Sequence, residues 1–366
     1  MINNQIYLPG LNGLRAIAAI TVLISHLFFE TFGNWGIKGI DLPIFTDGVT
    51  LFFVISGFLI TYLLLHEIKN TNTINIPKFY IRRILRIWPI YYLYILIVIA
   101  VLWWLGQVSD ILNDRLFYYI FFTANIPFLS AIGISLIVHY WSIGVEEQFY
   151  LFWPWLIKIS MKKITIAAFS VLIAWVLLKY GSYILFTNKS IVYKFFNVTR
   201  FHCMMIGAIG AIGYYNKNKV FMRFFTNIWS QVISWVIFIC LGLFFKYIPA
   251  LLTAESIAIL SLFLIMSQIE GKPKFINLEN KFFDFIGKIS YGIYVIHPIL
   301  IFLLSALWLK LNIQLPNWAQ YILICTLVPS ITIFVAWVSY QNYEKPFLKL
   351  KNKFAVVESQ NSKTIL

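Results

Sequence analysis

The sequence predicts an all-α protein, a bundle of about ten membrane-spanning helices with both termini in the cytoplasm. Of its 366 residues, 60% are hydrophobic and 12% are charged, a balance far from that of soluble domains. Apolar runs of about 18 to 25 residues recur along the chain, which is the length that an α-helix needs to cross a bilayer. A transmembrane β-barrel would instead show short segments of alternating hydrophobicity.

The net charge of +15 comes from lysines and arginines that cluster between the apolar runs. This placement follows the positive-inside pattern of membrane proteins and argues against a nucleic-acid partner. Cys203, Cys240 and Cys325 are scattered through apolar segments, so we expect neither a disulfide framework nor a metal site.

Alternating basic clusters set the topology, because cytoplasmic loops carry an excess of Lys and Arg. The stretch 116–129 is short and interrupted by Asn125 and Pro127, so we expect it to be re-entrant or interfacial. Two further short crossings within 116–139 are the alternative. Residues 1–347 are predicted to form one membrane domain, and 348–366 a frayed, basic cytoplasmic tail. The predicted spans are about 11–30, 47–66, 79–105, 140–160, 164–186, 199–215, 228–246, 250–269, 284–309 and 319–342.

Arg15 and His26 are candidate functional residues within the first span. Their separation of eleven positions is three helical turns plus about 20°, so both face the same way, roughly 16 Å apart along the axis. Ionisable residues in a span usually face the bundle interior or a wet cavity. The alternative is an interfacial arginine and a buried, hydrogen-bonded histidine without function.

Three arginines, Arg82, Arg83 and Arg86, lie on one turn at the cytoplasmic start of the third span. Guanidinium groups bind phosphate bidentately, and a helix N-terminus adds free N–H groups and positive potential. The cluster therefore predicts a site for a phosphate-bearing ligand, with anchoring to anionic lipid as the alternative. We expect Arg15 at a similar depth on the first span.

Glu146 and Glu147 are adjacent carboxylates in a predicted span, and at most one can face a shared cavity. We expect Glu146 to lie level with His26 and to orient it. Further candidates for binding substrate are Tyr150, Arg200 at the outer start of its span, and His297 in mid-membrane.

Four further polar residues lie in or near the predicted spans, namely Ser56, His66, His139 and His202. Ser56-Gly57 predicts a close approach between two helices, and a nucleophilic Ser56 is a minor alternative. His66, His139 and His202 are predicted to be interfacial and without a role.

Six short motifs are weak singly but specific in this order and spacing. They are Gly13-Leu14-Arg15 with His26, the run 52–60, Arg82-Arg83-Ile84-Leu85-Arg86-Ile87-Trp88-Pro89, Trp141-Ser142 leading to 146–150, Ser290-Tyr291 leading to His297-Pro298, and 343–347. Over about residues 8–347 the chain resembles the acyltransferase-3 family of bacterial integral-membrane acyltransferases.

The resemblance implies an acyl-CoA donor, usually acetyl-CoA. We expect no metal cofactor, because no metal-ligand spacing occurs in the sequence. The resemblance implies as acceptor a hydroxyl of a cell-surface or periplasmic glycan, such as O-antigen, exopolysaccharide or peptidoglycan, or a lipid-linked sugar. It places the protein in the bacterial cytoplasmic (inner) membrane, in contact with lipid. It carries over Arg15 and His26 as an essential pair, and the basic motif as a binding site.

The chain departs from the family at Thr50 and His202, where the family often has acidic residues. Some relatives carry a C-terminal esterase-like domain, which we expect this chain to lack.

These expectations combine into a mechanistic hypothesis. The arginines hold the nucleotide end of the donor, and His26 is the general base at the thioester. A covalent acyl-histidine or acyl-serine relay remains an alternative. So do a carrier that moves a lipid-linked glycan without chemistry, and an acyltransferase with a cytoplasmic or lipid acceptor.

Overall fold

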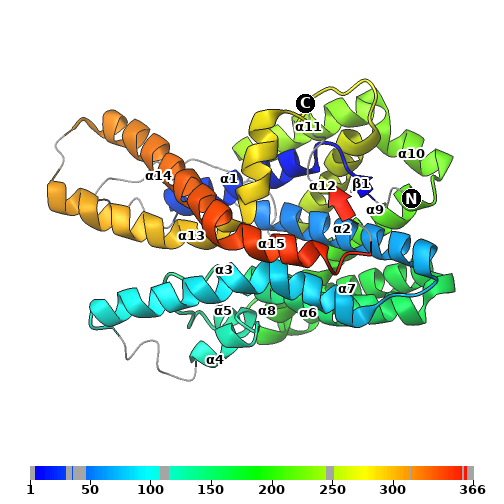
Figure 1. Cartoon of the computed structure of the whole chain (residues 1–366), viewed down its shortest axis with the longest axis horizontal. Coiled ribbons are helices and arrows are strands. Elements are labelled where there is room, and N and C mark those ends of the chain that lie inside the picture. The colour runs from blue at the N-terminus through cyan, green and yellow to red at the C-terminus, as the bar shows by residue number, and fades with distance from the viewer. Residues whose placement is uncertain are drawn as a thin grey trace.

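The computed structural model describes residues 5–29, 35, 47–107, 115–244, 251–312, 315–356 and 358–360. Helices dominate this part of the chain, which confirms the predicted all-α class (Figure 1). Two short strands, β1 (Gln5–Tyr7) and β2 (Glu358–Gln360), pair in parallel. A 3-10 turn covers Met161–Lys163, and a π-helix covers Tyr340–Glu344. The α-helices are α1 (Leu11–Phe29), α2 (Gly48–Thr71), α3 (Ile76–Trp104), α4 (Arg115–Ile120), α5 (Asn125–Leu129), α6 (Tyr140–Ile159), α7 (Ile164–Phe186), α8 (Ile191–Thr199), α9 (Phe201–Tyr215), α10 (Lys219–Thr226), α11 (Ile228–Phe244), α12 (Thr253–Glu270), α13 (Lys281–Leu311), α14 (Asn317–Ser339) and α15 (Lys345–Asn352).

A helix occupies each of the ten ranges predicted to span the membrane. Within the described residues, 8 helical stretches are long and apolar enough to cross a bilayer, and the pair α10 and α11, bent by 50°, adds a ninth candidate. Helix α6 is not among these stretches, and it is less apolar than they are because it carries Glu146, Glu147 and Gln148. The fold is that of a multi-pass membrane protein, while the count of ten crossings and the cytoplasmic termini stay predictions.

The segment before α6 contains two short helices. Helix α4 has 6 residues and α5 has 5, so neither is long enough to cross a bilayer. The hydroxyl of Tyr119 accepts a hydrogen bond from the backbone N–H of Ile134 at 2.9 Å, and the Tyr91 hydroxyl donates to the Tyr119 carbonyl at 2.6 Å. These contacts fold the segment back against the bundle, which favours a re-entrant stretch over two further crossings.

Helices α2 and α9 approach each other closely at two glycines. A Cβ atom at Gly57 would clash with the carbonyl oxygen of Met204, and one at Gly207 would clash with that of Val54. The prediction that Ser56-Gly57 permits close helix packing is confirmed.

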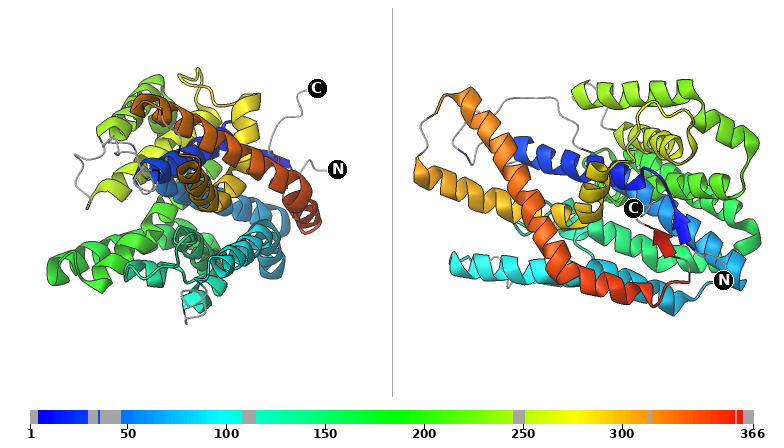
Figure 2. Two further views of the ribbon diagram at one scale, coloured as in Figure 1. Left: turned by 90° about the vertical axis from the view of Figure 1, so that its left-hand side faces the viewer. Right: turned by 45° about the horizontal axis from the view of Figure 1, so that its top comes forward.

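The two ends of the described chain lie together on one side of the bundle. Helix α14 crosses α13 and continues through the π-helix into α15, which packs along α3 (Figures 1 and 2). Strand β2 then pairs with β1, which directly precedes α1. The predicted domain boundary after residue 347 falls inside α15. The prediction of a frayed tail is wrong for the described residues after position 347, because α15 packs on α3 and β2 pairs with β1.

Candidate active site

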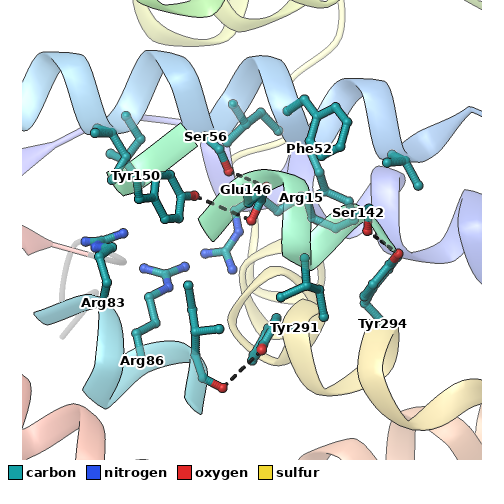
Figure 3. A pocket seen from close by; sticks show the side chains of 17 residues that line it. Arg15, Phe52, Ser56, Arg83, Arg86, Ser142, Glu146, Tyr150, Tyr291 and Tyr294 are labelled. Atoms are coloured by element: carbon teal, nitrogen blue, oxygen red, sulfur yellow. Dashed lines mark hydrogen bonds between the residues drawn. The ribbon is translucent and has the colours of Figure 1, made fainter. Parts of the chain in front are cut away.

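A cavity of about 80 Å³ lies between α1, α2, α3, α6 and α13. We call it the arginine cavity. Figure 3 shows the side chains of Arg15, Arg83 and Arg86 pointing into the same space. Three cations from two helices far apart in sequence thus meet at one depth, as predicted for Arg15 and the α3 cluster. The other polar residues that line it are Ser56, Ser142, Glu146, Tyr150, Tyr291 and Tyr294.

Arg83 is the most deeply placed cation of α3. Its side chain is buried, with 8% exposed, and its guanidinium lies 5.7 Å from the ring centroid of Phe79 and 5.9 Å from that of Tyr150. Among the described residues, the Nε atom has no hydrogen-bond partner. A buried guanidinium N–H without a partner is costly, so this geometry favours a bound anion.

Arg82 does not line the arginine cavity. It forms an ion pair with Glu67 at 2.9 Å and donates to the carbonyl oxygen of Phe354 at 3.1 Å. Adjacent residues on a helix point about 100° apart, so Arg82 and Arg83 face different neighbours. The structure therefore divides the predicted cluster of three arginines into two groups.

Glu146 accepts hydrogen bonds from the Ser56 hydroxyl at 2.7 Å and the Tyr150 hydroxyl at 3.4 Å (Figure 3). Of the two adjacent glutamates, Glu146 lines the arginine cavity and Glu147 does not, in line with their predicted divergence. The predicted pairing of Glu146 with His26 is not what the structure shows. Glu146 lies with Arg15, whereas His26 faces a different cavity.

A second cavity, of about 340 Å³, lies beside the C-terminal end of α1 and is lined by His26. We call it the histidine cavity. Its wall includes His139 and Trp141 from the region before and at the start of α6, and Ser305 from α13. It combines apolar and polar side chains, a surface suited to a ligand with hydroxyl groups.

The imidazole of His26 stacks on that of His297, with ring centroids 4.8 Å apart, and their Nδ1 and Nε2 atoms are 2.6 Å apart. His297 Nδ1 lies 2.8 Å from the carbonyl oxygen of Tyr294 and 3.2 Å from that of Ile293. Carbonyl oxygens only accept, so this nitrogen carries a proton, and in the neutral ring His297 Nε2 is an acceptor. His26 Nδ1 therefore donates to His297, and in neutral His26 the lone pair is on Nε2.

His139 joins this pair, although the sequence predicts it to be interfacial. It is 5% exposed, its ring centroid lies 5.3 Å from that of His297, and its Nε2 lies 3.2 Å from the carbonyl oxygen of Val295. The prediction is wrong because the folded-back segment before α6 places His139 inside the bundle. Its only sequence signal is its position just before the Trp141-Ser142 motif.

Tyr294 links the two cavities, a role that the sequence did not indicate. Its side chain lines the arginine cavity, and its carbonyl oxygen accepts from His297. Its hydroxyl donates to the carbonyl oxygen of His139 at 2.8 Å. The tyrosine thus connects the wall of one cavity to the histidines of the other.

Arg200 and His202 lie outside both cavities. Arg200 donates to Asp47 at 2.6 Å and to Thr50 at 2.8 Å. Thr50 stands where the family often has an acidic residue, and in this chain Asp47, three residues earlier, supplies the carboxylate that pairs with Arg200. Its predicted role in binding an acceptor gains no geometric support. His202 is buried beside Glu255 at 3.2 Å, which corrects its predicted interfacial placement.

Among the described residues, no group of three or more His, Cys, Asp or Glu side chains has the arrangement of a metal site.

The fold and the two cavities define a multi-pass helical membrane protein in which a cationic cavity lies beside a pair of stacked histidines. The chain matches the family described as an acyltransferase domain over residues 8–338, and it belongs to this acyltransferase-3 family. The resemblance predicted from the six motifs is confirmed. No solved structure matches the chain.

Three curated relatives show the range of similarity. Peptidoglycan O-acetyltransferase OatA of Listeria monocytogenes is 27% identical over 94% of this chain and 56% of its own length. A putative O-acetyltransferase of Staphylococcus aureus strain COL is 30% identical over 94% of this chain and 58% of its own. A putative peptidoglycan O-acetyltransferase, YrhL, of Bacillus subtilis is 34% identical over 42% of this chain and 24% of its own. The chain spans little more than half the length of the first two.

Proposed function

We propose that the protein is a membrane O-acyltransferase of the bacterial cytoplasmic membrane. It transfers an acetyl or other short acyl group from acyl-CoA to a hydroxyl of an extracytoplasmic glycan, with peptidoglycan as the first candidate. Two of the relatives support the acceptor class, because their names specify peptidoglycan. The observation that carries the proposal is that one face of α1 presents Arg15 to the arginine cavity and His26 to the histidine cavity.

The donor lies with its phosphates among Arg15, Arg83 and Arg86, which line one cavity. Guanidinium groups suit phosphate, and a low-dielectric site strengthens the attraction. By helix rise, His26 lies roughly 16 Å further along α1, a distance of the order of the pantetheine arm. The thioester therefore reaches the level of the histidines while the nucleotide stays at the arginines.

The acceptor hydroxyl enters through the histidine cavity and meets His26 Nε2. Its oxygen attacks the thioester carbonyl carbon while its proton passes to Nε2. The carbon–sulfur bond then breaks, and the coenzyme A thiolate leaves and takes the proton back from the imidazolium. The products are the acyl ester and free coenzyme A. Glu146 acts on the donor side, where it balances the charge of Arg15, rather than on His26.

The proposal is tested with protein purified in detergent, acetyl-CoA labelled in the acetyl group, and soluble peptidoglycan fragments. We expect labelled ester on the glycan, and release of free coenzyme A in equal amount. An unlabelled glycan, with no thioester consumed and no donor bound by a correctly folded protein, would contradict the proposal. It would favour a carrier of lipid-linked glycan or a different donor.

His297 is proposed to position His26 rather than to bind substrate. Because His297 Nε2 accepts from His26 Nδ1, it selects the tautomer with a lone pair on His26 Nε2. His297→Ala should lower kcat roughly 100-fold with little change in either KM. His297→Gln should recover part of kcat, because its amide oxygen can accept the same proton. Equal kcat values for the two variants, or a change confined to KM, would contradict a positioning role.

A further inference from the structure

Helix α15 is held along the N-terminal half of α3 by contacts before and after it. Before it, the Tyr343 hydroxyl donates to the carbonyl oxygen of Pro89 at 3.3 Å. After it, the carbonyl oxygen of Phe354 accepts from Arg82 at 3.1 Å, and β2 then pairs with β1. Figure 1 shows α15 lying along α3. The helix is therefore placed to contribute a side chain to the basic region of α3.

A small cavity of about 30 Å³ lies between α2, α3 and α15. We call it the C-terminal cavity. Its polar lining is Glu67, Arg82, Arg83, Lys351 and Asn352. Arg83 and Ile60 line both this cavity and the arginine cavity, so the two are adjacent. The volume admits a group of the size of a phosphate but not a nucleoside, which must extend outward from it.

The charges around this cavity are not balanced. Lys351 is partly buried and is repelled by Arg86, Arg83, Arg15 and Arg82. The Glu67 carboxylate is already paired with Arg82. Among the described residues, Lys351 has no carboxylate at ion-pair distance, and Arg83 Nε has no partner. Partly buried cations without counter-charges favour the binding of an anion between them.

We propose that Lys351 and Arg83 together bind the donor phosphate that lies farthest from the thioester, the ribose 3′-phosphate of coenzyme A. The inference rests on the proposed function, since it assumes a coenzyme A donor. The order of groups along the donor supports it. With the thioester near His26, the pyrophosphate falls at Arg15, Arg83 and Arg86, and the next phosphate falls in the adjacent C-terminal cavity. An anionic lipid headgroup carries the same phosphate chemistry and is the other possible source.

The test compares the binding of coenzyme A with that of 3′-dephospho-coenzyme A, in nanodiscs with and without phosphatidylglycerol. Wild type should prefer coenzyme A. Lys351→Ala should weaken the binding of coenzyme A roughly 10-fold and leave that of the dephospho form unchanged. Lys351→Arg should retain most of the preference. Lys349→Ala, which removes an exposed lysine from the same helix, is the matched control and should behave as wild type.

Three other outcomes would overturn the inference, and a fourth separates it from the proposed function. A wild type without preference, or an equal loss of both ligands in Lys351→Ala, would exclude contact with the 3′-phosphate. An effect of Lys351→Ala seen only with phosphatidylglycerol would assign the residue to a lipid headgroup. If wild type binds neither ligand, the coenzyme A donor itself is refuted.

Discussion

Replacing His26 with alanine is expected to reduce acyl transfer at least about 100-fold, because it removes the proposed general base. The affinity for the donor should stay close to that of wild type. The reason is the separation of the two cavities, since His26 lines the histidine cavity while the arginines line the other. The measurement is single-turnover transfer from labelled acetyl-CoA together with equilibrium binding of coenzyme A.

His66→Ala is the matched control for this variant. His66 lies on α2, with its ring centroid 4.6 Å from that of Tyr62 and 5.2 Å from that of Tyr215, and it lines neither cavity. We expect its transfer rate to equal that of wild type. A His26→Ala protein that transfers at the wild-type rate would refute the base, and one that also loses donor binding would refute the separation by depth.

The pairing of Arg15 with the α3 arginines could be predicted from sequence because both follow from local rules. Helical periodicity places Arg15 and His26 on one face, and the positive-inside pattern places the start of the third span at the cytoplasmic side. Each rule depends on one helix and its flanking charges. The structure brings the predicted cations together in the arginine cavity.

The depth of Glu146 in the bundle could not be predicted from sequence, because it depends on how far one helix is shifted along its neighbour. The prediction assumed that the outer ends of the spans lie in one plane. In the structure α2 begins beside the middle of α1, where a Cβ atom at Gly48 would contact the carbonyl oxygen of Ala18. Ser56 and its partner Glu146 therefore fall at the level of Arg15 rather than of His26. Hydropathy gives the limits of each helix but not these offsets.

The buried histidines show a second limit. His139 and His202 stand at the ends of apolar segments, which predicts an interfacial position. Each is instead covered by elements distant in sequence, His139 by α13 and His202 by α12 with its Glu255. A single sequence does not specify which helices become neighbours, so the partners that satisfy these side chains appear only in the folded chain.

Replacing Arg83 with alanine is expected to weaken the binding of the acyl donor by roughly 10- to 100-fold, the usual effect of losing a charge-assisted hydrogen bond to phosphate. Arg83 lines both the arginine cavity and the C-terminal cavity, and its buried Nε has no partner among the described residues. It is therefore placed to contact two donor phosphates. Arg83→Lys should recover only part of the affinity, because an ammonium cannot bind bidentately. Equilibrium dialysis with labelled acetyl-CoA measures each dissociation constant.

The control for general loss of positive charge is Lys78→Ala, which removes an exposed cation one turn before Arg82 on the same helix. If the arginine acts through direct contact, Lys78→Ala should bind the donor as wild type does, and the Arg83→Ala deficit should persist at high salt. An equal deficit in both variants that disappears at high salt would mean that α3 attracts the donor only by long-range charge. At saturating donor, Arg83→Ala should transfer at a rate near that of wild type, since the histidine pair is intact. This separation of binding from chemistry is opposite to the one expected for His26→Ala, so the two variants together test whether donor and base occupy different depths of the bundle.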